Sequence, residues 1–235
     1  MSAAIIQLSD VRFRWRREDP LVLDIPELKV GVGERIFIKG PSGSGKTTLL
    51  NLLGGVCVPE AGKLAVLETD LAALNSARRD AFRADHIGFI FQMFNLVPYL
   101  SLVDNVTLPC HFSALRRRRA LDRSANLEVE ARRLLEHMEL DVAALSSRPV
   151  SRLSIGQQQR VAAARSLIGA PALLIADEPT SALDADVQRL FLDILFREVD
   201  EASASLLFVS HDSSMEAGFD RTIALADLNR VQPHE

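Results

Sequence analysis

The sequence predicts an α/β fold, with a largely parallel β-sheet covered by helices and a helical segment inserted into it. Helical stretches alternate with short apolar runs of strand length, and this alternation is typical of parallel sheets. Between Gln92 and Leu153 the strand patterns fade, and charged sequence of helical character takes their place. The strand-like runs cover residues 35–38, 86–91, 172–176, 206–210 and 222–226.

Length and composition predict one domain, residues 1–235, with a substantial buried core. The chain has 235 residues and is 48% hydrophobic, which is ample for such a core. We expect residues 1–92 and 154–235 to form the α/β part that binds a ligand, and residues 93–153 to form a helical subdomain.

Charge and cysteine content exclude several classes of protein. The net charge of -4 argues against nucleic acid as the main partner, because such binding depends on basic surface, although a local basic patch remains open. Cys57 and Cys110 match no metal-ligand spacing and are expected to be free thiols in a reducing compartment.

The chain shows no signal-peptide pattern and no apolar run near the ~18 residues of a spanning helix. We therefore expect no direct membrane span, and any membrane role to come through another chain.

Two features stand out in the predicted helical segment. The run Arg116–Arg119 is interpreted as a solvated face, with a contact to acidic lipid headgroups or to a partner loop as the alternative. Further along, apolar residues recur at the spacing that places them on one face of a helix. They are Leu127, Ala131, Leu134, Leu135 and Met138.

The stretch GPSGSGKTT carries the clearest chemical signal. It matches the phosphate-loop pattern completely and lies between a strand-like and a helix-like run, which is the context that gives the pattern meaning. Its glycines let backbone N–H groups point at phosphate oxygens at the positive end of the following helix. Lys46 is expected to reach the β- and γ-phosphates, and the Thr47 hydroxyl to bind Mg²⁺. The predicted nucleotide-binding residues here are Gly40, Pro41, Ser42, Gly43, Ser44, Gly45, Lys46, Thr47 and Thr48.

A phosphate loop also requires a carboxylate that holds the metal ion. The apolar run LLIA ends in Asp177 and Glu178, so Asp177 is expected to hold Mg²⁺ and Glu178 to polarise the attacking water. A general base placed beside a metal ligand predicts hydrolysis, because binding alone needs no proton acceptor.

Four further motifs resemble those of the ATP-binding cassette (ABC) family. LSIGQQQR, residues 153–160, is similar to the LSGGQ signature, and the Q-loop, D-loop and switch-histidine candidates are FQ, SALD and VSHD. The resemblance implies a phosphate-loop NTPase (RecA-like) core with an N-terminal antiparallel β subdomain. It also implies that Gln92 contacts Mg²⁺ and the water, that His211 holds the γ-phosphate, and that Asp184 couples two sites.

The signature implies that two copies of the chain act together. In the family, the serine and backbone amides of the signature face the γ-phosphate held by the opposite subunit, here Ser154, Gly156 and Gln157. Since each motif occurs once, we expect a head-to-tail homodimer with two ATP molecules. Ile155 departs from the usual glycine, so the backbone there is expected to have negative φ.

The resemblance also suggests where the adenine base binds. Trp15 aligns with the aromatic residue that stacks on adenine in the family, and a plain packing role is the alternative.

Two stretches resemble one branch of the family, the lipoprotein-release and macrolide-export ATPases (the LolD/MacB group). They are FQMFNLVPYLSLVDNV, residues 91–106, and LLNLLGG, residues 49–55. The resemblance implies an ATP-hydrolysing motor subunit at the cytoplasmic face of the inner membrane, bound through a separate FtsX/MacB-like permease and working in export, extraction or mechanotransmission. A soluble ABC-type ATPase of DNA repair or translation is the alternative. It is disfavoured because the chain has neither a long coiled coil nor a second cassette.

Overall fold

The computed structural model describes residues 4–146 and 148–231 of the chain. Its contacts divide the chain into two compact units, one combining the chain up to Arg83 with the part from Ser205 onward, the other running from Ala84 to Ala204. The helical subdomain expected over 93–153 lies within the second unit.

The first unit contains an antiparallel sheet with the strand order β2-β1-β4-β5. In β1 the residues that alternate along one face are buried, which is the pattern of a sheet with one side on the core. This sheet is the predicted antiparallel β subdomain. Its strands are β1 (Ala4–Phe13), β2 (Leu23–Gly31), β4 (Ala61–Val66) and β5 (Thr69–Asp70).

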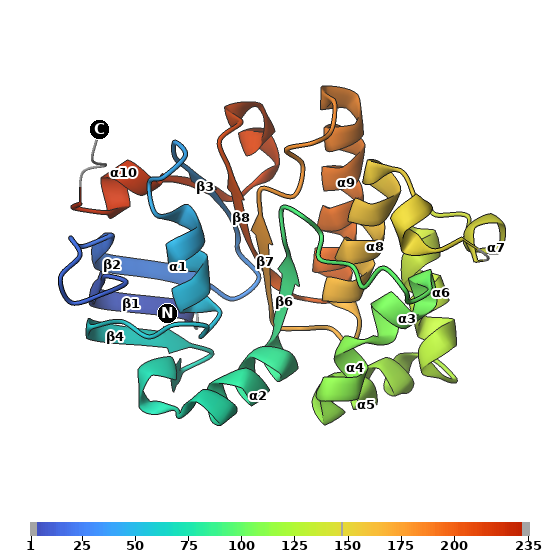
Figure 1. Cartoon of the computed structure of the whole chain (residues 1–235), viewed down its shortest axis with the longest axis horizontal. Helices are drawn as coiled ribbons and strands as arrows, with labels where there is room; N and C mark the ends of the chain where they lie inside the picture. The colour runs from blue at the N-terminus through green and yellow to red at the C-terminus, as the bar shows by residue number, and fades with distance from the viewer. Residues whose placement is uncertain (1–3, 147, 232–235) are drawn as a thin grey trace. The chain divides into compact units, whose positions relative to one another are not determined.

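The same unit also contains three parallel strands, with β3 in the middle (Figure 1). Phe37 of β3 and Phe208 of β8 stack at 5.9 Å between ring centroids and are fully buried. The predicted run 222–226 is strand only in its first part, because Leu225 already begins a short helix. The elements are β3 (Arg35–Lys39), α1 (Lys46–Leu53), β8 (Ser205–Ser210), β9 (Arg221–Ala224) and α10 (Leu225–Leu228), while α2 (Ser76–His86) leads out of the unit.

The second unit combines two parallel strands with most of the helices. Strands β6 (Ile87–Ile90) and β7 (Leu173–Asp177) pair in parallel, and α8 packs against β6, α3, α6 and α9 (Figure 1). No strand occurs among the described residues between 91 and 153, as expected for a helical insertion. The helices are α3 (Leu102–Thr107), α4 (Pro109–Phe112), α5 (Ala114–Arg123), α6 (Leu127–His137), α7 (Val142–Leu145), α8 (Ile155–Leu167) and α9 (Ala185–Glu201).

The helix predicted from apolar spacing is α6, and its buried face includes Ala131, Leu134 and Leu135. The interpretation of the arginine run as a solvated face is wrong for Arg116, which is only 3% exposed. Its guanidinium donates to the carbonyls of Ile168 and Ser166, at 2.8 and 2.7 Å. The reason is that the last carbonyls of a helix have no partner within it, and Arg116 supplies the missing donors for α8.

In the described part of the chain, no helix is both long enough and apolar enough to cross a membrane.

Candidate functional site

The phosphate loop lies between β3 and α1, as predicted. Gly43 and Gly45 have φ of 79° and 97°, a region that side chains other than glycine rarely adopt. A Cβ on Gly45 would also lie 3.0 Å from the Leu23 side chain and 3.4 Å from the Val22 carbonyl. The sequence therefore needs glycine at position 45 for both backbone conformation and space.

Lys46 is the first residue of α1 and is almost fully buried. Its Nζ donates to the carbonyl oxygens of Gly40 and Pro41, at 2.7 and 2.9 Å. Ser44 Oγ also donates to the Pro41 carbonyl, at 2.8 Å. These bonds hold the ammonium inside the curve of the loop, where helix N-terminal amides also favour an anion.

His211 comes directly after β8, which is the neighbour of β3. The parallel register pairs Lys39 with Ser210, so the phosphate loop and His211 leave the sheet at the same edge and level. Asp212, the next residue, donates its backbone N–H to Ser210 Oγ at 3.1 Å and closes the turn. The first unit thus brings His211 to the phosphate-loop edge of the sheet.

Trp15 lies just after β1 and is 57% exposed. Its ring meets the Phe13 ring edge to face, at 5.0 Å and 86°. It lines a hollow of about 530 Å³ together with Arg14, Arg16, Arg17 and Glu60. The Arg14 guanidinium, 2.7 Å from a Glu60 carboxylate oxygen and 3.2 Å from the Asp19 carbonyl oxygen, ties this turn to the residue just before β4.

The turn that carries Trp15 returns to the phosphate loop. The backbone N–H of Val22 donates to the Phe13 carbonyl at 2.9 Å, and Val22 and Leu23 are the neighbours of Gly45. The largely exposed Trp15 ring therefore lies on a turn whose end contacts the start of α1.

In the second unit, the expected water-polarising and metal-binding residues share an edge of the β6–β7 pair. The register pairs Ile90 with Ala176, so Gln92, after β6, leaves the sheet at the level of Asp177 and Glu178. Glu178 has a φ of 44°, which is unusual for a residue with a side chain. Strained backbone of this kind persists where surrounding structure holds it, often at functional sites.

The signature residues form the start of α8. Ser154 is the N-cap: its Oγ accepts from the Gln157 N–H at 3.2 Å, and Gln157 Oε1 accepts from the Ser154 N–H at 2.9 Å. This capping box fixes the first turn of the helix. Ile155 begins α8, does not have positive φ, and is 51% exposed. The expectation of negative φ at Ile155 is confirmed, and its side chain points away from the core.

Asp184 is the N-cap of α9, and its carboxylate accepts from the Val187 N–H at 3.0 Å. A Cβ on Gly156 would lie 3.9 Å from the side chains of Leu183 and Val187, which is ordinary contact distance. The signature and the D-loop are therefore neighbours within the second unit.

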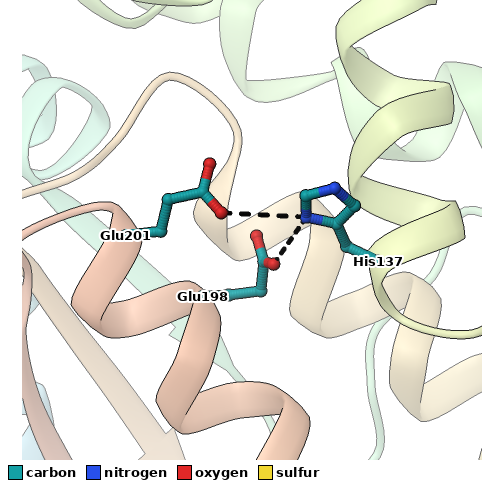
Figure 2. A group of neighbouring side chains, drawn as sticks. All are labelled: His137, Glu198 and Glu201. Carbon is teal, nitrogen blue, oxygen red and sulfur yellow. Dashed lines mark hydrogen bonds and ion pairs between the residues drawn. The ribbon is translucent and has the colours of Figure 1, made fainter.

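A separate group of titratable side chains joins the ends of α6 and α9. Figure 2 shows two carboxylates directed at one nitrogen of the His137 ring, with Nδ1 2.7 Å from a carboxylate oxygen of Glu198 and 3.8 Å from one of Glu201. A guanidinium nitrogen of Arg133 lies 3.2 Å from the same Nδ1, and a guanidinium nitrogen of Arg123 lies 3.1 Å from a carboxylate oxygen of Glu201. Because arginines already occupy the positions a cation would take, we interpret this group as an ion-pair network that joins two helices.

Sequence patterns gave no indication of several buried polar residues next to the site. Arg165, on α8, donates to the carbonyls of Phe94 and Asn95, which follow the Q-loop glutamine. Asn105, on α3, is fully buried and bonds the backbone of residues 97–101. The available signal was a charged residue inside the apolar stretch VAAARSLI.

Comparisons with known proteins agree with this geometry. The model of the ABC transporter family matches residues 23–181. The chain is 39% identical to the lipoprotein-releasing system ATP-binding protein LolD of Syntrophotalea carbinolica, over 90% of this chain and 88% of that protein. It is 36% identical to the macrolide export ATP-binding/permease protein MacB of Burkholderia pseudomallei, over 100% of this chain but 35% of that longer protein.

A solved structure shows the same architecture. The dimeric ATP-binding cassette MJ0796, in a post-hydrolysis state bound to ADP and Pi, matches with a TM-score of 0.77 and 32% identity over 93% of each chain. The family match, the curated relatives and the arrangement of the motifs lead to one conclusion. The chain belongs to the ABC transporter family and is one of its ATP-binding, ATP-hydrolysing cassettes.

Proposed function

We propose that the chain is the ATPase motor of a transporter at the cytoplasmic face of the inner membrane, acting on a membrane permease of the FtsX/MacB type in export, extraction or mechanotransmission. Support comes from relatives named for lipoprotein release and for macrolide export. The matched relatives give no support to the alternative of a soluble ATPase in DNA repair or translation.

The nucleotide-binding residues are proposed to be those of the phosphate loop, with Trp15 against the adenine. Gly40 to Thr48 supply backbone amides and the Lys46 ammonium for the phosphates, and Lys46 already lies within the curve of the loop. Thr47, Gln92 and Asp177 supply the oxygen ligands that Mg²⁺ prefers. When bound, the ion neutralises charge on the β- and γ-phosphates during transfer to water.

Glu178 is proposed as the general base, and His211 as the residue that holds the γ-phosphate. Glu178 would take a proton from the attacking water as its oxygen bonds to the γ-phosphorus and the bond from that phosphorus to the ADP oxygen breaks, while Gln92 orients the water. The register that places Gln92 level with Glu178 supports this pairing.

We also propose that two copies of the chain form a homodimer around two ATP molecules, as the dimeric cassette MJ0796 does around its product. Ser154, Gly156 and Gln157 at the start of α8 would face the γ-phosphate held by the partner, and Asp184 would couple the two sites. The capped N-terminus of α8 favours an anion at this position.

The single observation that carries the permease proposal is the segment after Gln92. It presents Met93, 80% exposed, and Tyr99, 85% exposed, on backbone that is held by buried polar side chains. Exposed apolar residues on ordered backbone, next to the residue proposed to contact Mg²⁺ and the attacking water, fit a docking site for a permease. Such a contact would connect hydrolysis to movement in the membrane.

Site-directed crosslinking tests this proposal. A Met93→Cys variant carrying a thiol-reactive photo-crosslinker should label preferentially, because burial raises the pKa of the native Cys57 thiol to about 11 and raises that of Cys110. In native membranes the crosslink should fall on an integral membrane protein. A Val129→Cys variant, on an exposed part of α6, is the control and should not give this product. Crosslinks from position 93 that reach only soluble proteins or nucleic acid would refute the motor-subunit proposal.

A further inference from the structure

One buried guanidinium connects the signature helix to the Q-loop. Arg165 lies near the end of α8 and is 9% exposed, and its pKa is lowered by desolvation. Its Nη1 donates to the Asn95 carbonyl at 2.6 Å and its Nη2 to the Phe94 carbonyl at 2.5 Å. Burying a charge is costly unless hydrogen bonds compensate, so these two short bonds are the main reason the side chain can lie there.

The backbone that accepts these bonds is strained. Phe94 and Asn95 have φ of 57° and 49°, in the left-handed region that costs free energy for residues with side chains. The turn closes through two further bonds, from Phe94 N–H to the Phe91 carbonyl at 2.9 Å and from Asn95 N–H to the Met93 carbonyl at 2.6 Å. Gln92 lies inside this turn, so whatever holds the turn also sets the position of Gln92.

A second buried side chain fastens the rest of the segment. The Asn105 amide accepts from the Val97 N–H at 2.8 Å and donates to the Val97 and Ser101 carbonyls at 3.1 and 3.0 Å. The segment from Phe91 to Ser101 has no regular secondary structure, yet buried polar groups hold it at both ends. Of Arg165 and Asn105, only Arg165 lies on α8.

We propose that Arg165 is a positioning residue that ties the Gln92 turn to the signature helix, so that the two move as one body. Helix α8 has 13 residues, about 20 Å at 1.5 Å per residue, with Ser154 at its start and Arg165 near its end. A displacement of the Gln92 turn is carried by the guanidinium to the end of α8, and by the rigid helix to the signature. The tie itself rests only on this chain; its use for coupling to a permease rests on the proposed function.

Arg116 provides a matched control within the same unit. It is also a buried arginine whose guanidinium donates to backbone carbonyls at the end of α8. Its hydrogen bonds reach residues 165–168 and not the Gln92 turn. Methionine at either position removes the charge and keeps most of the apolar stem, so both variants lose a comparable buried group.

Amide hydrogen exchange on the purified full chain tests the tie without any permease. In Arg165→Met, exchange of the peptide covering residues 91–101 should rise by about tenfold or more, because the turn loses two charge-assisted bonds. In Arg116→Met, faster exchange should be confined to the end of α8. An unchanged 91–101 peptide in Arg165→Met, or an equal rise in both variants, would overturn the proposal.

Turnover gives a second readout that general destabilisation does not mimic. Arg165→Met should lower kcat by about tenfold while the Kd for ATP stays within about twofold, since the phosphate loop is untouched. Arg116→Met, assayed below its melting temperature, should keep kcat within about twofold of the original chain. Equal loss of kcat in the two variants would show a purely structural role. If position 93 does not crosslink to a membrane protein but the hydrogen-exchange result is as expected, the proposed permease contact is refuted, while the link between Arg165 and the Gln92 turn is supported.

If Arg165→Met does not fold, a milder pair keeps the proposal testable. Arg165→Lys retains the charge, but a single ammonium replaces the two-pronged guanidinium, so the 91–101 peptide should exchange several-fold faster. Asn95→Gly removes the steric cost of the left-handed backbone and keeps the carbonyl, and should partly restore protection in the Arg165→Lys background. Strictly additive effects of the two substitutions would contradict the tie.

Discussion

Replacing Trp15 separates nucleotide binding from packing. The ring has one edge-to-face contact, with Phe13 at 5.0 Å, and is 57% exposed. Loss of that contact in Trp15→Ala should lower the free energy of unfolding by about 0.5–1.5 kcal/mol. If the exposed face stacks on adenine, the same substitution should also weaken ATP binding by about 1–3 kcal/mol, or roughly 5- to 150-fold in Kd.

Titration calorimetry on the tryptophan, tyrosine and alanine chains measures this difference directly. Trp15→Tyr should lose far less affinity than Trp15→Ala, because an aromatic face remains. Since Trp15 is the only tryptophan, ATP and ADP should both change the emission of the original chain. Pyrophosphate, which carries no base, serves as the control and should leave the emission nearly unchanged. If Trp15→Ala binds ATP as tightly as the original chain, the indole is a packing residue and the base is held elsewhere.

Three further outcomes are expected from other parts of the structure. Glu178→Gln should bind ATP as before but release phosphate at least ~10²-fold more slowly, and phosphate release near the original rate would exclude Glu178 as the base. In light scattering, the Glu178→Gln variant should be monomeric without nucleotide and dimeric with ATP and Mg²⁺, and adding Ile155→Gly should tighten the dimer. A monomer at saturating ATP would contradict the proposed dimer. Burial disfavours ionised Glu130, but hydrogen bonds from Arg133 and Ser124 outweigh this and lower its pKa below 4.5. The ionised Glu130 carboxylate therefore stabilises the folded chain above pH 4.5, and this contribution is lost as the pH falls through the lowered pKa of the folded state. In urea unfolding, Glu130→Gln should be less stable than the original chain at pH 7, and the difference in free energy of unfolding should shrink in acid. A difference independent of pH would refute the role of the charge.

The strands that carry the chemical motifs could be predicted because each is a short apolar run with a motif at its end. The run at 35–38 became β3 and the run at 172–176 became β7, each extended or shifted by one residue. The helical segment was also predictable, since α6 follows its apolar spacing. Local sequence determines such elements, so a local pattern is enough to find them.

The buried polar residues could not be predicted in this way. A run of four arginines favours a solvated face, yet Arg116 is buried because the end of α8, far away in sequence, leaves carbonyls without partners. Arg165 and Asn105 likewise satisfy backbone of segments that have no regular structure. The need for these donors arises only after distant segments have packed together, and no periodicity in the sequence records it.

If Glu178 is the general base proposed above, its left-handed backbone sets stability against activity at one position. A φ of 44° is accessible to glycine without steric penalty, whereas a residue with a Cβ bears a cost of about 1–2 kcal/mol there. A selection for thermal resistance alone would therefore favour glycine at this position and discard the carboxylate next to Asp177. Any attempt to make this cassette more robust has to hold position 178 fixed and look for stability in other parts of the chain.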